Sequence, residues 1–119
     1  MKAFIISPVK NLTQPQKEDL LMIKKFLESQ GYVIHLPIVD TNQTASSLEI
    51  CLQNKKAIED SEEVFIWYDS NSSGSLFDLG IAFSLNKKIT SLNEIKPTDK
   101  KSFANLILEY SNTTKPKQF

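Results

Sequence analysis

The sequence predicts an α/β three-layer sandwich built on a central parallel sheet of four to five strands. Short apolar runs alternate along the chain with longer segments of helical period. Such alternation is typical of strands joined by right-handed helical crossovers. The run from Val64 to Tyr68 contains almost no polar residue, as expected of a central strand covered on both faces. We therefore expect one domain over residues 1–112, followed by a flexible tail over residues 113–119.

The first strand and helix are predicted from an apolar run and a periodic segment. Residues 2–7 form a short, mostly apolar run that Pro8 ends, which indicates a buried strand. A helix is expected to begin after Thr13, with Pro15 in its first turn, because proline is tolerated where the backbone N–H has no partner. Gly31 is expected to end this helix in a left-handed conformation.

The second strand and the second helix are predicted to be joined by a polar loop. Residues 32–36 are predicted to form the second strand, and residues 38–46 a polar loop long enough to fold over a site. A second helix is expected from Ser46 or Ser47 to about Asp60, because a serine precedes the apolar-periodic residues.

The remaining elements include the stretch around which we expect the chain to be organised. The central strand over residues 64–68 is followed by a loop of small polar residues at 70–75 and a helix over about 76–86. Residues 89–92 are predicted to form a fourth strand and residues 102–110 an amphipathic helix.

The third helix is predicted to contact both the sheet and a second subunit. Gly80 and Ala82 are small and are expected to let the helix lie close to the sheet. Phe77, Ile81 and Leu85 give the helix more apolar positions than one buried face needs. A homodimer or larger homo-oligomer is therefore expected.

The loop at residues 70–75 is the main candidate for ligand binding. In an open α/β sheet, ligands bind beyond the carboxyl ends of the strands, and the loop Ser7–Asn11 opens onto the same crevice. Serine hydroxyls and backbone N–H groups at a helix N-terminus favour an anion. The candidate binding residues are Ser7, Pro8, Lys10, His35, Asp69, Ser72, Gly74 and Ser75. The alternative is that the serines only cap the helix, that Asp78 complements its dipole, and that His35 is a hydrogen-bonded structural residue.

The composition excludes several classes of function. Fourteen basic and fourteen acidic residues cancel, so neither nucleic acid nor a membrane surface is expected as a partner. One histidine and one cysteine do not make a metal-ligand set, and we expect no cofactor. Cys51, inside a helical pattern, indicates a buried structural thiol in a reducing compartment. No signal-peptide pattern or membrane-spanning run is visible, so a cytoplasmic location is expected.

Two segments carry a resemblance to a known family. They are Asn54-Lys-Lys-Ala-Ile-Glu-Asp-Ser-Glu-Glu-Val-Phe-Ile and Ser72-Ser-Gly-Ser-Leu-Phe-Asp78-Leu-Gly-Ile-Ala-Phe. Together they resemble the nucleoside 2-deoxyribosyltransferase family, and most closely its deoxynucleoside 5′-monophosphate N-glycosidase members. The resemblance implies a flavodoxin-like or Rossmann-like fold. It also implies cleavage or exchange of the bond between a base and a 2-deoxyribose.

The resemblance further implies a role for three residues. Asp78 matches the family's nucleophilic glutamate, Ser72 matches the serine that meets a 5′-phosphate, and Asn54 matches an aspartate that helps to hold or protonate the base. Asp78 is one methylene shorter than glutamate, and Asn54 cannot donate a proton as an acid. Asp78 and Asn54 are therefore the candidate catalytic residues of a small-molecule N-glycosidase or deoxyribosyltransferase. The alternatives are an inactive nucleotide-binding module and a purely structural subunit.

Overall fold

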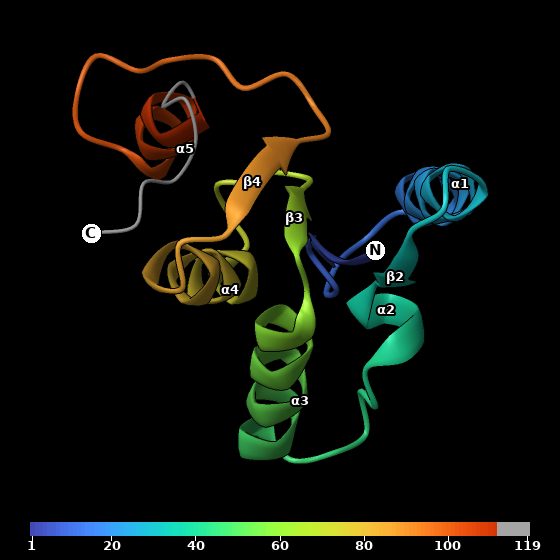
Figure 1. Ribbon diagram of the computed structural model, residues 1–119. Coiled ribbons are helices and arrows are strands. Elements are labelled where there is room, and N and C mark those ends of the chain that lie inside the picture. Colours follow the sequence, from blue (N-terminus) through green and yellow to red (C-terminus); the bar gives the residue numbers. More distant parts are fainter. Residues whose placement is uncertain (112–119) are drawn as a thin grey trace.

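The computed structural model describes residues 1–111 and contains a four-stranded parallel sheet with strand order β2-β1-β3-β4 (Figure 1). This confirms the predicted α/β fold class. The elements, in chain order, are β1 (Lys2–Ile6), α1 (Gln14–Ser29), β2 (Val33–His35), α2 (Pro37–Asp40), α3 (Ser47–Asp60), β3 (Glu63–Ile66), α4 (Ser73–Ser84), β4 (Lys88–Ser91) and α5 (Phe103–Ser111). The predicted tail, residues 113–119, lies outside the described residues.

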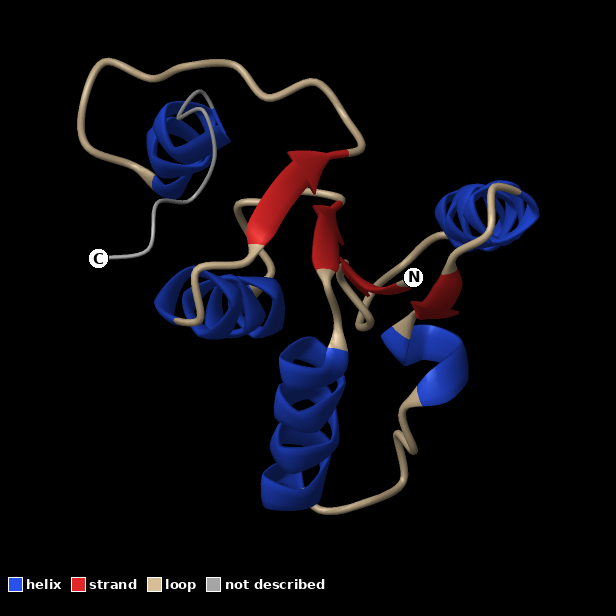
Figure 2. Cartoon of the chain, in the orientation of Figure 1, coloured by secondary structure: helices blue, strands red, loops and turns tan. Residues whose placement is uncertain are grey.

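Helices cover both faces of the sheet, which gives the three layers (Figure 2). On one face, α3, α4 and α5 pack Ile58, Leu79 and Ile107 against the strands. On the other face, α1 packs Leu20 and Leu27 against side chains that alternate with the first set along β1 and β3. Because successive strand residues point to opposite faces, both faces of the central strands are apolar.

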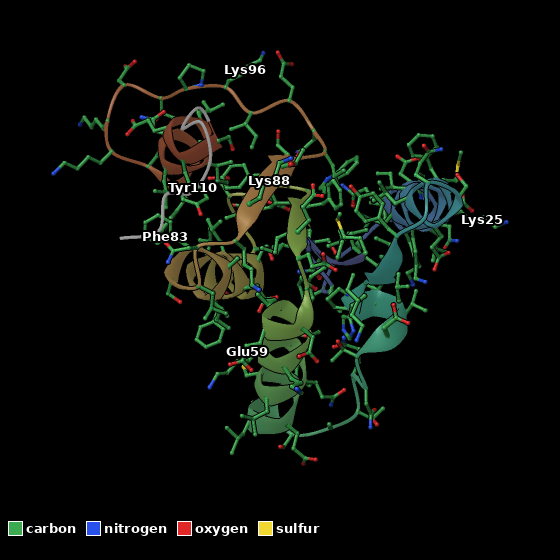
Figure 3. All side chains as sticks on the ribbon, in the orientation of Figure 1. Lys25, Glu59, Phe83, Lys88, Lys96 and Tyr110 are labelled. Carbon is green, nitrogen blue, oxygen red and sulfur yellow. The ribbon has the colours of Figure 1, made fainter. Side chains whose placement is uncertain are left out.

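The contact between α4 and α5 extends the first of these layers. Phe83 and Tyr110 lie side by side between the two helices, with ring centroids 5.3 Å apart (Figure 3). The Tyr110 hydroxyl donates to the backbone carbonyl of Lys87 at 2.7 Å, so its polar end is satisfied while the ring is packed. This contact fastens the last described helix to the end of α4.

The helix boundaries follow from side-chain caps. The Thr13 side chain accepts from the backbone N–H of Gln16, whose own side chain accepts from the N–H of Thr13, so α1 begins with a complete capping box. Ser46 caps α3 by accepting from the backbone N–H of Glu49. Gly31 has a φ of +97°, so the left-handed conformation predicted after α1 is present.

Three local predictions are wrong. The polar loop expected over residues 38–46 begins with α2, because Pro37 fits the first helical position and Asp40 accepts from the backbone N–H of Leu36 at 2.8 Å. The third helix begins at Ser73, not near residue 76, because Ser72 caps it. Gly80 lies on the exposed side of α4, whereas Ala82 is fully buried against the sheet.

The ends of β1 and β3 lie next to each other at the carboxyl edge of the sheet. Ile6 pairs with Ile66, and the backbone N–H of Trp67 donates to the carbonyl of Ile6 at 2.8 Å. The loops that follow these two strands therefore start side by side. The second of them leads directly into α4.

Candidate functional site

Asp78 is a buried carboxyl group in the second turn of α4, one turn later than its predicted place. Its exposed fraction is only 6%, although aspartate is rarely buried without a partner. The side-chain nitrogen of Asn54, on α3, lies 3.5 Å from one of its oxygens. Burial raises the pKa of Asp78 from 3.8 to about 7, because the charged form loses hydration. Asp78 thus changes its charge near neutral pH.

Asn54 is itself held by a second polar side chain. The Thr41 hydroxyl, from the turn after α2, donates to the Asn54 side-chain carbonyl at 2.6 Å. The Thr41 oxygen in turn lies 2.8 Å from Nε2 of His35, at the end of β2. We call these four side chains, His35, Thr41, Asn54 and Asp78, the polar network.

His35 is held by a hydrogen bond to Thr41 and by ring stacking on Phe4. Its ring stacks on Phe4 with centroids 5.2 Å apart and planes 9° apart. Burial lowers the pKa of His35, so the neutral imidazole is favoured at pH 7. The ring also borders a surface hollow of about 450 Å³ between β2 and α3, with Asp40, Gln53 and Lys56 among the other lining residues. These contacts correspond to the structural alternative that the sequence left open for His35.

The serines that begin α4 form a compact turn. The Ser72 hydroxyl accepts from the backbone N–H of Ser75 at 3.2 Å and donates to the Ser75 hydroxyl at 2.8 Å. Ser75 is buried, whereas Ser73 and Gly74 are exposed in the first turn. Ser72 therefore does cap the helix, as the alternative interpretation held, and the same turn presents two exposed residues at the helix N-terminus.

Asp69, which precedes the serines, stabilises this turn through two hydrogen bonds. The Asp69 carboxylate accepts from the backbone N–H of Asn71 at 2.9 Å, and the Asp69 backbone carbonyl accepts from the N–H of Ser72. This is an Asx-type turn, in which a short carboxylate replaces a backbone acceptor. The hydrogen bonds of Asp69 thus set the direction in which the chain enters α4.

The loop after β1 contributes a buried and an exposed residue. Ser7 and Pro8 are buried, and Lys10 is exposed. The hydroxyl of Ser7 is the one fully buried side-chain N or O atom in residues 1–111 that lacks a hydrogen-bond partner. A buried polar group without a partner costs about 1 to 3 kcal/mol, so such a hydroxyl is suited to a hydrogen bond from a ligand.

The predicted site residues fall into separate groups. Among the described residues, hydrogen bonds link Asp78 to Asn54 and, through Thr41, to His35. A separate hydrogen bond links Ser72 to Ser75, and no side-chain hydrogen bond of the described residues connects the two groups. Sequence reasoning missed Thr41 as a member of the site. Its only signal was a place in the polar segment after the second strand, and many threonines have that.

In residues 1–111, no group of three or more His, Cys, Asp or Glu side chains is arranged to hold a metal ion. None of the helices there is long and apolar enough to cross a membrane.

The sheet order, the flanking helices and the nearly full coverage by solved relatives define a chain with the fold of the nucleoside 2-deoxyribosyltransferases. The 2-deoxyribosyltransferase of Bacillus psychrosaccharolyticus has a TM-score of 0.66 and 16% identity, with 99% of this chain and 100% of that chain covered. The CMP N-glycosidase BcmB of Clostridium botulinum has a TM-score of 0.63 and 18% identity, with 94% and 84% covered.

A third solved structure has a similar fold. The 2-desoxiribosyltransferase of Leishmania mexicana has a TM-score of 0.62 and 14% identity, with 99% of this chain and 79% of that chain covered. No protein-family model matches the sequence, and no curated protein matches it significantly. The likeness is therefore one of fold, and it agrees with the fold that the sequence resemblance implies.

Proposed function

We propose that the protein breaks the N-glycosidic bond of a nucleoside or nucleotide, by hydrolysis or by transfer of the deoxyribosyl group, with Asp78 as the nucleophile. The observation that carries this proposal is the buried Asp78 carboxyl group, held beside the Asn54 amide in the second turn of α4. The shared fold supports it, because the similar solved structures include an N-glycosidase and two deoxyribosyltransferases.

The proposed reaction has two steps. In the first, an ionised Asp78 oxygen attacks the anomeric carbon, the bond to the base breaks, and the base leaves with the bonding electron pair. In the second, water or another base attacks the same carbon and releases Asp78. Because burial raises the pKa of Asp78 to about 7, the attacking form accumulates as the pH rises through neutrality.

Asn54 has a limited part in this reaction. Its amide N–H points to the Asp78 carboxylate at 3.5 Å and orients it, but an amide does not protonate a leaving base. The departing base must therefore take its proton from another group or from solvent. We infer that substrates whose bases leave easily react fastest.

The proposed substrate class is the nucleoside 5′-monophosphate. The N-terminus of α4 combines neutral serine side chains with two exposed residues, Ser73 and Gly74, and a helix N-terminus favours a dianionic phosphate. Ser72 is also at the position that the family resemblance links to the phosphate. Lys10, exposed in the loop after β1, is proposed to add positive charge.

The test measures, by chromatography, the base released from matched pairs of deoxynucleosides and their 5′-monophosphates. Wild type is expected to release base, and Asp78→Ala is expected to release none while keeping the wild-type circular dichroism spectrum. Lys56→Ala serves as the control, because Lys56 is exposed and its ion pair to Asp60 lies on the surface of α3. Equal base release by wild type and Asp78→Ala would contradict the proposal.

An inactive nucleotide-binding module is the second candidate. It is favoured by the identity of the two central residues, since Asp78 is shorter than glutamate and Asn54 has no acidic proton. Calorimetric titration that shows binding of a monophosphate, together with no base release and no base exchange over days, would decide for this candidate.

A further inference from the structure

The hydrogen bonds of the polar network have one direction when Asp78 is ionised. A carboxylate only accepts hydrogen bonds, so the Asn54 group at 3.5 Å must be its N–H₂. The Asn54 carbonyl then points to Thr41 and accepts its hydroxyl hydrogen at 2.6 Å. With that hydrogen used, the Thr41 oxygen accepts from His35, so Nε2 of His35 must carry a hydrogen.

From this arrangement we infer that Thr41 and His35 are positioning residues, which hold the Asn54 amide with its N–H₂ group toward Asp78. The carbonyl oxygen and the N–H₂ group of an asparagine amide are similar in shape. The hydrogen bonds around the amide therefore decide which of the two groups faces a neighbouring side chain. Thr41 and Asn54 are both buried, so water does not compete readily for these groups. The catalytic consequence rests on the proposed function, but the geometric part does not.

The polar network ends at His35, whose position is fixed by ring stacking and by strand pairing. His35 stacks on Phe4, and its place at the end of β2 is set by the pairing of Phe4 with His35 in the sheet. The chain of contacts thus runs from the sheet, through the turn after α2, to α3 and α4. It orients Asn54 from the side opposite to Asp78.

The charged groups near the network lie at its His35 end. Asp40 raises and Lys24 lowers the pKa of His35, both less strongly than burial does. Lys2, Lys56 and Asp60 border the same hollow as His35. At the Asp78 end burial is the cause of the raised pKa. A change in Asp78 titration on altering Thr41 therefore reports the hydrogen bonds, since threonine carries no charge.

The first test measures the titration of Asp78 in the ligand-free protein by carboxyl carbon NMR. Thr41→Val keeps the shape of the side chain but removes its hydroxyl, so the Asn54 amide loses its orientation and Asp78 loses a donor. The pKa of Asp78 is expected to rise by about 0.5 to 1 unit. Thr41→Ser keeps the hydroxyl and is expected to titrate like wild type.

A second matched pair addresses His35 in the same way. His35→Phe keeps a ring to stack on Phe4 but has no donor, and is expected to move the Asp78 titration in the same direction as Thr41→Val. His35→Gln places an amide N–H near the position of Nε2, so the Asp78 midpoint in this variant is expected to return to the wild-type value. An Asp78 midpoint that is unchanged in both Thr41→Val and His35→Phe would overturn the inference.

The third test needs no substitution and so does not depend on any variant folding. At pH 8.5 Asp78 is ionised and His35 is neutral, and nitrogen NMR then shows which ring nitrogen carries the hydrogen. The inference requires hydrogen on Nε2. Hydrogen on Nδ1 would mean that Nε2 accepts from Thr41, and the inferred direction would be wrong.

These outcomes are separable from those of the proposed function. All three NMR measurements are made without substrate, so they stand even if no base is released. If the protein is active, the acid limb of the pH profile of kcat/KM should shift with the Asp78 midpoint in Thr41→Val. In Thr41→Ser the acid limb should lie at its wild-type position. A loss of activity in Thr41→Val without a shifted limb would count against a positioning role.

Discussion

The side-chain nitrogen of Asn54 lies 3.5 Å from a carboxylate oxygen of Asp78, although the two residues are 24 positions apart and belong to different helices. The pair exists because α3 and α4 pack on the same face of the sheet. It couples the charge state of a buried acid to the packing of two helices. The stability and the activity of the protein should therefore depend on pH through the same group.

The free energy of unfolding should fall as the pH rises from 4 to 7. The pKa of Asp78 is about 7 in the folded chain and ordinarily 3.8, so in this window the folded state binds more protons than the unfolded state. Asp78→Asn removes this dependence. Between pH 5 and pH 8, wild type should lose roughly 2 to 3 kcal/mol relative to the variant in urea unfolding. Identical pH dependence in the two proteins would show that Asp78 titrates normally.

The rate of base release should rise with pH through about 7, because only ionised Asp78 attacks the sugar. Asp78→Glu should increase the rate by up to about a hundredfold, since the longer side chain brings the carboxylate nearer to the substrate. Steady-state kinetics from pH 5 to 9 on both proteins measure these effects. A pH-independent rate over that range would exclude Asp78 as the titrating group.

Wild type should bind a nucleoside 5′-monophosphate about ten- to a hundredfold more tightly than the nucleoside, and Ser72→Asp should narrow or reverse this preference. The reason is that a carboxylate at the cap of α4 repels a phosphate but accepts from a 5′-hydroxyl. Ser46→Asp is the control, because it places the same acid at the cap of α3. Calorimetric titration decides the point, and equal affinities for the two ligands in wild type would refute phosphate binding by this turn.

Gly80→Ala should stabilise the protein by about 0.5 to 1 kcal/mol. Gly80 lies inside α4, where alanine is the better helix former, and an added Cβ would meet no atom within 4 Å. Gly31→Ala is the opposite case. It also has open space, but its φ of +97° strains any residue with a Cβ, so this variant should be destabilised. Thermal or urea unfolding of both variants tests the pair, and a destabilised Gly80→Ala would be evidence for a contact across that side of α4.

The protein should be a homodimer or larger assembly in solution. Leu48 and Leu52 on α3 and Phe77 on α4 are more than half exposed, and the two helices are neighbours. Phe77→Glu is expected to lower the molar mass seen by light scattering, because it places a charge in this apolar surface. Met22→Glu, at an exposed apolar residue of α1, should leave the mass unchanged. A monomer for wild type at high concentration would disprove the expectation.

The sequence predicts the strands and the longer helices in the right order along the chain, and a parallel sheet, but not the short helix α2. Apolar runs such as the one that contains β3 report burial on both faces, and caps such as Thr13 and Ser46 mark helix starts through local hydrogen bonds. These are short-range effects, so they can be recognised from neighbouring residues. The predicted start of α4 differs from the observed one because Ser72, Ser73 and Ser75 are equally suitable caps when only the sequence is known.

Which polar side chains meet depends on the packing of the helices on the sheet and not on a local sequence pattern. Thr41, Asn54 and Asp78 come from three separate segments, and nothing in their spacing predicts a contact. Their hydrogen bonds depend on how α3 and α4 pack on the sheet and on where the turn after α2 lies. The raised pKa of Asp78 has the same origin, because desolvation is a property of the surrounding packed atoms and not of the residue. The same packing puts Gly80 on the outside of α4 and Ala82 against the sheet.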